Sequence, residues 1–340
     1  LALTDHGNLH GALQFYQQAK EIGVRPVLGI EAYIAPESRF KKDAGTSKES
    51  SYHLTLLARD RQGFRNLLKL SSAAFLEGFY FRPRIDKELL AAHSEGLICL
   101  SGCVSSELNR LLLAGGEASL RKAEQVAAWF ARVFPDRYFI EIQNNGLEEQ
   151  RVAREAAVDL ARRMGLPVVA TSDVHYVERE DAAAQDILLC VNTGKYRADT
   201  NRMRMETEEF YLRSPEEMYA AFPGLEDAVA RSQEIADGCD VELELGKRHF
   251  PVFTPPEGKS STEYLRELCE EGLRHRYADR PDRCLNGQLA PEVQARLDRE
   301  LAVIEKLGFP NYFLIVWDFV RFARQQGIAA TARGSGVGSL

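Results

Sequence analysis

The sequence of 340 residues lacks an apolar run long enough to cross a bilayer. Its most hydrophobic segment, YFLIVWDFV at 312–320, is too short for a membrane span and contains an aspartate. A stretch with the features of a secretory signal peptide is also absent. These absences exclude a membrane-spanning protein, and we expect a soluble, cytoplasmic one.

Paired cysteines are missing too, since no two of the six cysteines are spaced as Cys-x-x-Cys. In a chain of this length, scattered cysteines indicate reduced intracellular thiols rather than a disulfide framework. They lie at Cys99, Cys103, Cys190, Cys239, Cys269 and Cys284.

The sequence has no excess of basic residues: 43 Lys and Arg stand against 50 Asp and Glu, for a formal net charge of −7. No global positive field therefore attracts nucleic acid, and any such contact must depend on local basic patches or bound metal ions. What is present is ordinary globular composition, 45% apolar and 27% charged. The length predicts about two domains.

Both ends of the sequence lack the features of a natural terminus. It starts with LALTDHGN, which has no Met and lies inside an apolar strand pattern, and it stops at RGSGVGSL without a terminating feature. We therefore expect a segment of a longer protein.

Apolar segments of strand length alternate with helical patterns over most of the chain. Strands are predicted at 1–4, 26–35, 52–58, 96–102, 137–143 and 166–172, and helices at 11–23, 63–76, 116–134 and 147–165. Repeated βα units predict an α/β fold with a mostly parallel sheet, open or closed into a barrel. The proline-containing segment 249–262 interrupts the pattern and is typical of a linker, and helices are predicted beyond it at 262–278 and 291–308.

Residues of metal-ligand type gather where the predicted strands begin or end. They are His6 with Asp5 beside it, Glu31, His53, Cys103, Asp173 and His175. In α/β folds the carboxyl ends of strands meet at one mouth, so these side chains are expected to converge. On an extended segment, Asp173 and His175 would point the same way. This pair alone fits a ligand pair, a catalytic dyad or an ordinary loop.

Taken as a set, the imidazole, carboxylate and thiol groups favour a metal centre. Nitrogen, oxygen and sulfur donors together suit zinc, manganese or iron rather than calcium. More than four ligands would imply two or three ions, with Glu31 able to bridge them and Asp5 able to orient His6 from behind. Clustered ions of this kind fit phosphoester hydrolysis.

Several longer segments carry a resemblance to a known family. In order along the chain they are LALTDHGNLHGALQFYQQAKEIGVRPVLGIEAY, YHLTLLARDRQGFRNLLKLSS, GFYFRPRIDKELL, LSGCVSSEL, VVATSDVHY, ETEEFYLRSPEEM and LGFPNYFLIVWDFVRFARQQGI. Together they resemble the bacterial DNA polymerase III alpha subunits, the replicative C-family DNA polymerases. The resemblance covers essentially the whole chain without large gaps.

This resemblance implies a distorted (β/α)7 barrel of the PHP (polymerase and histidinol phosphatase) type at 1–248, lacking its first strand. A linker at 249–262 and the helical N-terminal part of a polymerase palm at 263–340 would follow. The full-length protein would be a DNA-directed DNA polymerase of chromosomal replication, with 5′–3′ nucleotidyl transfer. Its partners would be primer–template DNA, dNTPs, the sliding clamp and other replisome subunits. The carboxylates that bind Mg²⁺ for this reaction would lie beyond Leu340.

Carried over residue by residue, the PHP metal cluster of the family falls on His6, Glu31, His53, Cys103, Asp173 and His175. The remaining ligands, an HxH pair and an acid, would lie upstream of Leu1. In members with a complete set, the PHP domain resembles a metal-dependent 3′–5′ exonuclease; in members with eroded ligands it is structural. All six ligand types are kept here, so the resemblance implies a di- or trinuclear cluster of Zn, Mn or Fe.

The segment RGSGVGS at 333–339 matches the family's loop that cradles the triphosphate of the incoming nucleotide. Glycines let backbone N–H groups approach phosphate oxygens, and an arginine adds charge-assisted contacts. The residues concerned are Arg333, Gly334, Ser335, Gly338 and Ser339. The family usually has Gly-Pro-Gly just before this loop, where this sequence has Ala-Thr-Ala at 330–332.

Two other interpretations remain. A free-standing PHP phosphoesterase would have no use for the 309–340 tail with its phosphate-loop pattern. A PHP domain that serves only as a scaffold for the polymerase would hold no metal.

Overall fold

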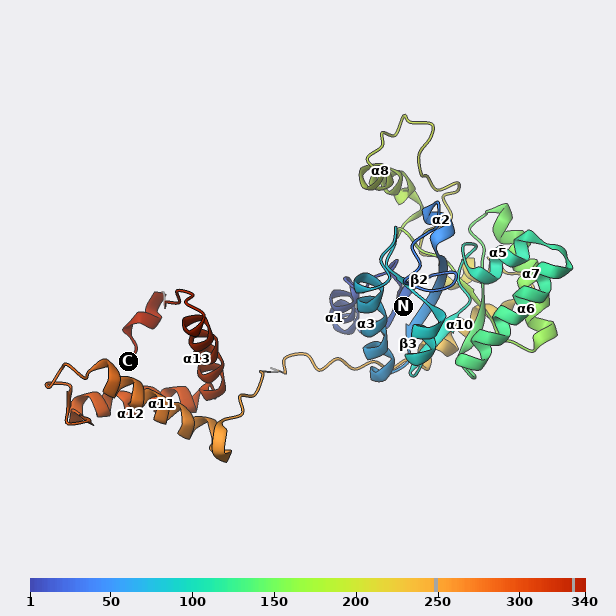
Figure 1. Ribbon diagram of the computed structural model, residues 1–340. Coiled ribbons are helices and arrows are strands. Elements are labelled where there is room, and N and C mark those ends of the chain that lie inside the picture. The colour runs from blue at the N-terminus through green and yellow to red at the C-terminus, as the bar shows by residue number, and fades with distance from the viewer. Residues whose placement is uncertain (248–249, 332–333) are drawn as a thin grey trace. The chain divides into compact units, whose positions relative to one another are not determined.

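The computed structural model describes residues 1–247, 250–331 and 334–340. The chain forms two compact units, Leu1–Leu243 and Glu244–Leu340 (Figure 1). In the part of the chain that the structure describes, no helix has the length and apolar character needed to cross a membrane.

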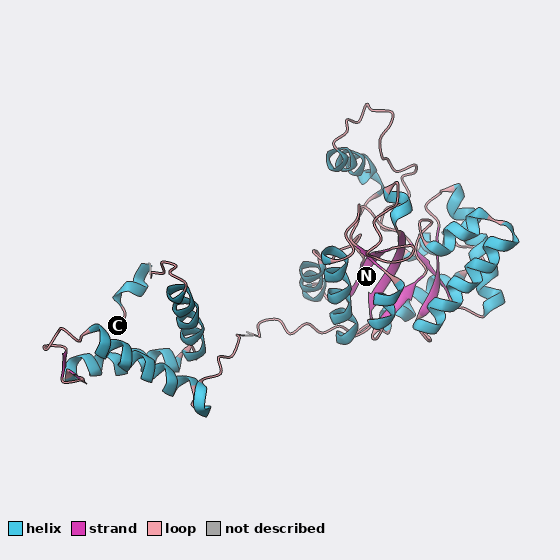
Figure 2. Ribbon diagram, viewed as in Figure 1, coloured by secondary structure: helices cyan, strands magenta, loops and turns pink. Residues whose placement is uncertain are grey.

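The first unit is built on one curled sheet (Figure 2). Its strands are β1 (Ala2–Leu3), β2 (Val27–Ile34), β3 (Tyr52–Ala58), β4 (Arg84–Ile85), β5 (Leu97–Leu100), β6 (Tyr138–Gln143) and β7 (Val168–Thr171). They are hydrogen-bonded in the order β1-β2-β3-β5-β6-β7, and β4 pairs with β2. The six predicted strands are confirmed, while β4 is too short to give an apolar pattern.

One strand departs from the expected parallel arrangement, because β3 runs antiparallel to both β2 and β5. The other pairs in the sheet are parallel. A parallel return requires the chain to cross back to the other end of the sheet, usually through a helix long enough to span it. The connection from β2 to β3 contains only the short helix α2 (Ser47–Ser50) and returns at the same end of the sheet.

Helices surround the sheet. They are α1 (Ala12–Glu21), α3 (Arg61–Leu76), α4 (Lys87–Ala92), α5 (Glu107–Ala114), α6 (Gly116–Val133), α7 (Glu148–Met164), α8 (Ala182–Thr193), α9 (Pro215–Ala221) and α10 (Glu226–Asp237). Figure 1 shows α1 and α3 on one flank of the sheet and α5, α6 and α7 on the other. The four helices predicted in this unit are confirmed, and α7 ends at Gly165 in the left-handed conformation that its Arg-Arg-Met-Gly end favours.

Side chains of β3 show how the sheet divides the interior. Leu54 and Leu56 belong to the main apolar core, into which the flanking helices pack. Leu57 points to the opposite face and packs with Ile98 and Val169 in a second, smaller apolar cluster. That cluster includes Ile235 of α10, so this part of the second face is filled. The polar residues of the same face lie toward the start of β3, where the predicted ligands are.

The second unit is helical, apart from the hairpin of β8 (Cys284–Leu285) and β9 (Gln288–Leu289). Its helices α11 (Ser261–Arg276), α12 (Pro291–Lys306) and α13 (Pro310–Gln325) share a small leucine core. The two predicted helices are confirmed as α11 and α12. The start of α11 is fixed by a capping box between Ser260 and Glu263.

Candidate metal centre

Three predicted ligands form a compact group in the structure. Nδ1 of His53 lies 2.6 Å from Oε1 of Glu31, and Nδ1 of His6 lies 3.3 Å from its Oε2. One ligand atom from each residue lies within 4.8 Å of the other two. This separation fits donors that share a metal ion.

Strand pairing explains why these three residues meet. His53 is directly opposite Tyr33 on β2, two residues from Glu31 on the same face of the strand. His6 follows β1 and forms a parallel bridge with Glu31, while the Gly7 N–H donates to the Glu31 carbonyl at 2.9 Å. Gly7 has φ +69°, and a β-carbon there would lie 2.9 Å from Pro83 and Tyr33. The turn that presents His6 therefore requires glycine.

Cys103 joins this group from the loop after β5. Its Sγ lies 3.5 Å from Oε1 of Glu31 and 3.5 Å from Nδ1 of His53. The loop is held by the Asn109 side chain, which donates to the carbonyls of Gly102 and Cys103. A thiol is thus added to two imidazoles and a carboxylate.

Asp173 and His175 complete the set from the loop after β7. Oδ1 of Asp173 lies 3.7 Å from Nδ1 of His175, and the His175 ring centroid is 6.0 Å from that of His6. The expectation of an extended segment here is wrong. The strand ends at Thr171, and Asp173 has φ +48°. A left-handed turn, which is uncommon for a non-glycine residue, brings the two side chains together instead of strand alternation.

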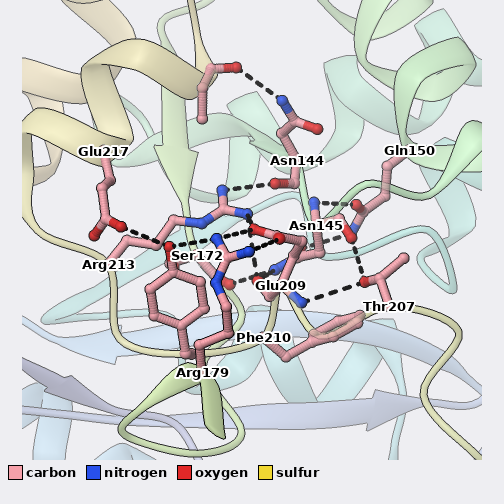
Figure 3. Close-up of polar contacts among 12 residues, drawn as sticks. Asn144, Asn145, Gln150, Ser172, Arg179, Thr207, Glu209, Phe210, Arg213 and Glu217 are labelled. Carbon is pink, nitrogen blue, oxygen red and sulfur yellow. Dashed lines mark hydrogen bonds and ion pairs between the residues drawn. The ribbon is translucent and has the colours of Figure 1, made fainter. Parts of the chain in front are cut away.

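A polar cluster holds this loop in place (Figure 3). The Asn145 side chain donates to the carbonyls of Ser172 and Glu209, both at 2.8 Å. Beyond it, the His175 N–H donates to the Phe210 carbonyl at 2.8 Å. The Glu209 carboxylate is in turn paired with Arg179 and Arg213. Sequence reasoning assigned no role to Asn145 or Glu209, although 206–212 belongs to one of the quoted family segments.

The environment shifts the acidity of the acidic groups in different directions. Burial would raise the pKa of Glu31, but the hydrogen bond from His53 and the nearby imidazole of His6 hold it below its usual value. Burial raises the pKa of Asp173, with His175 opposing the shift. Burial and the neighbouring carboxylates raise the pKa of the Cys103 thiol well above its ordinary value. A cation among these groups would favour all three deprotonated forms.

Asp5 and the residues of the predicted phosphate loop were also singled out in the sequence. The Asp5 main-chain carbonyl accepts a hydrogen bond from the Glu31 N–H at 3.0 Å, so Asp5 is tied to the group by its backbone. Arg333 lies outside the described residues. Gly334–Gly338 form a short 3-10 helix. The Ser339 hydroxyl donates to the Glu300 carboxylate at 2.6 Å, so an oxygen anion already contacts this end of the predicted phosphate loop.

Comparison with known proteins finds similarity in both units. Residues 1–145 match the family model of the PHP domain, and residues 263–340 match that of the bacterial DNA polymerase III alpha NTPase domain. The whole chain is 44% identical to the DNA polymerase III subunit alpha of Borreliella burgdorferi and 45% identical to that of Treponema pallidum. It is 41% identical to the corresponding subunit of Thermus aquaticus.

The alignments cover 100% of this chain but only 29%, 28% and 32% of these three relatives. The chain thus spans about a third or less of the length of the curated relatives it matches. Similarity nevertheless extends over every part of the chain, including both units. By sequence, the chain is similar over its whole length to bacterial DNA polymerase III alpha subunits, and residues 1–145 of its first unit match the PHP domain.

Proposed function

We propose that the first unit contains a metal centre for phosphoester hydrolysis. Its activity would be that of a 3′–5′ exonuclease on DNA primer ends. The observation that carries this proposal is the convergence of His6, Glu31 and His53 within 4.8 Å. Cys103, Asp173 and His175 extend the group to six candidate ligands. Such a set of nitrogen, oxygen and sulfur donors suits zinc, manganese or iron, in a cluster of two or three ions.

When bound, clustered ions of this kind activate water and neutralise charge on a leaving phosphate oxygen. The protein contributes the arrangement: two strands, two loops and a turn present donors to one point. The Glu31 carboxylate faces His6 with one oxygen and His53 with the other, so it can bridge two ions.

We further propose that the chain acts within a replicative DNA polymerase, by 5′–3′ nucleotidyl transfer onto primer–template DNA. The similarity to DNA polymerase III alpha subunits supports this role. The partners would be dNTPs, the sliding clamp and other replisome subunits, with Mg²⁺ serving the polymerase reaction. In this proposal residues 1–248 are the PHP domain, 249–262 a linker and 263–340 the N-terminal part of the palm. Arg333, Gly334, Ser335, Gly338 and Ser339 would contact the nucleotide triphosphate.

Metal analysis tests the hydrolytic proposal. The 340-residue chain, loaded with Zn²⁺, Mn²⁺ or Fe²⁺ and dialysed, is expected to retain metal, and the variant Glu31→Gln is expected to lose it. The variant His10→Gln is a matched control because His10 is exposed, packs on Phe75 and is not one of the candidate ligands. If the parental chain retains no metal, the hydrolytic proposal is wrong and the scaffold interpretation is favoured.

A further inference from the structure

The strand β6 contributes none of the six candidate ligands, although it lies between β5 and β7, whose following loops both carry them. In place of a ligand it carries Glu141, whose residue is 4% exposed. Its neighbours Ile140 and Ile142 belong to the main apolar core. By strand alternation, Glu141 therefore faces the other side of the sheet, where the candidate metal centre lies.

The Glu141 carboxylate accepts three hydrogen bonds, each from a different segment. Its Oε2 accepts from the Thr55 hydroxyl at 3.0 Å and from the Gly102 N–H at 3.1 Å. Its Oε1 accepts from the Thr171 hydroxyl at 2.6 Å. One side chain thus joins β3, the loop after β5 and the end of β7.

Each of these donors lies next to a candidate ligand in the sequence. Thr55 is two residues from His53, Gly102 precedes Cys103, and Thr171 is two residues before Asp173. Thr55 is also directly opposite Glu31 across the β2–β3 pair. The three hydrogen bonds therefore constrain the segments that carry three of the ligands, and the pairing of Thr55 extends the constraint to a fourth.

The loop after β5 is fitted closely to this arrangement. Gly102 has φ +86°, and a β-carbon there would lie 2.7 Å from the His53 carbonyl oxygen. The Ser101 hydroxyl accepts a hydrogen bond from the Glu141 N–H at 2.9 Å. The main chain of Glu141 thus contacts Ser101 and its side chain contacts Gly102, the two residues that lead to Cys103.

A buried carboxyl at this position is unfavourable for the fold alone. Burial raises the pKa of Glu141 to about 7, against hydrogen bonds from Thr171 and Thr55 that lower it. An apolar side chain would avoid this desolvation. Both the neutral and the ionised carboxyl have oxygens that accept hydrogen bonds, so the three contacts do not depend on ionisation.

We propose that Glu141 is a positioning residue of the metal centre, which fixes the segments bearing His53, Cys103 and Asp173 from behind. This inference rests on the proposed metal centre. Glu141 itself holds no ion. Partners of this kind set ligand orientation, and their loss typically lowers metal affinity about 10- to 100-fold.

Two substitutions separate the acceptor role from side-chain volume. Glu141→Met removes the three acceptors and keeps the approximate volume, and Glu141→Gln keeps acceptor oxygen. With Zn²⁺ supplied from a metal buffer to the 340-residue chain, the Met variant should bind at least about 10-fold more weakly than the parent. The Gln variant should bind within about threefold of the parent. Asp86→Asn is the control, because Asp86 is an equally buried carboxylate whose contacts are with Arg39 and the start of α4.

Hydrogen exchange of the metal-free chain provides an independent readout. In Glu141→Met, residues 101–106 and 171–176 should exchange at least about 10-fold faster than in the parent, whereas in Asp86→Asn they should exchange at the parental rate. If the parental chain binds no Zn²⁺, the proposed metal centre fails and this exchange result alone decides whether Glu141 positions the segments.

Unchanged Zn²⁺ affinity together with unchanged exchange in Glu141→Met would overturn the inference. If that variant does not fold, Thr171→Val removes the hydrogen bond to Glu141, together with a longer one of 3.5 Å from the Gln143 side chain, at nearly constant volume. It should speed exchange at 171–176 and weaken Zn²⁺ binding, and parental values for both would equally overturn the inference.

Discussion

Nδ1 of His53 lies 2.6 Å from Oε1 of Glu31, across one of the two antiparallel strand pairs in a sheet that was predicted to be mostly parallel. Because β3 runs antiparallel, its first residues lie beside the last residues of β2. An imidazole at the start of one strand thereby reaches a carboxylate near the end of the other.

Glu31→Gln is expected to remove metal binding from the first unit. The neutral amide has one oxygen in place of the two charged oxygens of the carboxylate, so it attracts a cation less strongly. The imidazoles of His6 and His53 also lose the carboxylate that they share. The loss of Zn²⁺ affinity should exceed the roughly 10- to 100-fold that is typical for residues behind the ligands. Competition with a colorimetric chelator measures it, and His10→Gln should match the parent.

Combined replacement of Asp173→Ala and His175→Ala should abolish 3′–5′ exonuclease activity in a polymerase III alpha chain that carries this sequence. Both side chains lie at the candidate centre, and each is less than a quarter exposed. Release of labelled nucleotides from a primer 3′ end provides the measurement. A double variant that degrades primer ends at the parental rate would show that this assignment is wrong.

Asn145→Leu should destabilise the first unit by about 3 kcal/mol. The substitution leaves the partly buried carbonyls of Ser172 and Glu209 without their donor, and it removes the contact with Gln150. Asn144→Ala, which loses one hydrogen bond to the Ala221 carbonyl, should cost about 1 kcal/mol. Urea unfolding followed by hydrogen exchange at 168–176 compares the two variants. Equal effects would contradict a special role for Asn145.

Stability of the first unit should fall as the pH rises between about 4.5 and about 7, through the contribution of Glu141. The folded state raises the pKa of this carboxyl from 4.5 to about 7, so the folded protein binds more protons than the unfolded chain in this window. The contribution is complete below the lower value and is lost above the higher one, with a size of up to about 3 kcal/mol. Denaturant unfolding at pH 5 and pH 8 measures the loss, and Glu141→Gln should reduce it.

Arg333→Ala is expected to raise the Michaelis constant for dNTPs in a polymerase III alpha chain with this sequence. The expectation follows from the RGSGVGS pattern, in which the guanidinium adds charge-assisted contacts to phosphate oxygens. A change of about 10-fold corresponds to one such contact of about 1.4 kcal/mol. Steady-state primer extension gives the constant, and an unchanged value would remove the triphosphate role.

Apolar patterning was enough to predict the six strands, since most of them contain a short buried apolar run such as LICL at 97–100. It could not predict the direction of β3, because a buried strand has the same pattern in either orientation. Residue types at strand ends indicated a common mouth, and the family resemblance selected the six candidate ligands.

Long-range polar contacts were beyond local sequence reasoning. Asn145 and Glu209 are 64 residues apart, and neither carries a pattern that links it to the Asp173 loop. Glu141 alternates with isoleucines in YFIEIQ, which is equally typical of a solvent-facing strand residue. Only the folded structure shows that its carboxyl is buried among donors from three segments. The turn at Asp173 depends on the same contacts, so its positive φ was not predictable either.

The reversed strand β3 has a consequence for access to the centre. Ile34 at the end of β2 is opposite Tyr52 at the start of β3. Both ends of the connecting segment 35–51 therefore lie at the same end of these two strands, the end toward which Glu31 and His53 lie. Changes in the length or charge of that segment can therefore alter which molecules enter, while the pairing that sets the distance between Glu31 and His53 stays the same. Entry and ligation are in this way encoded by separate stretches of the chain.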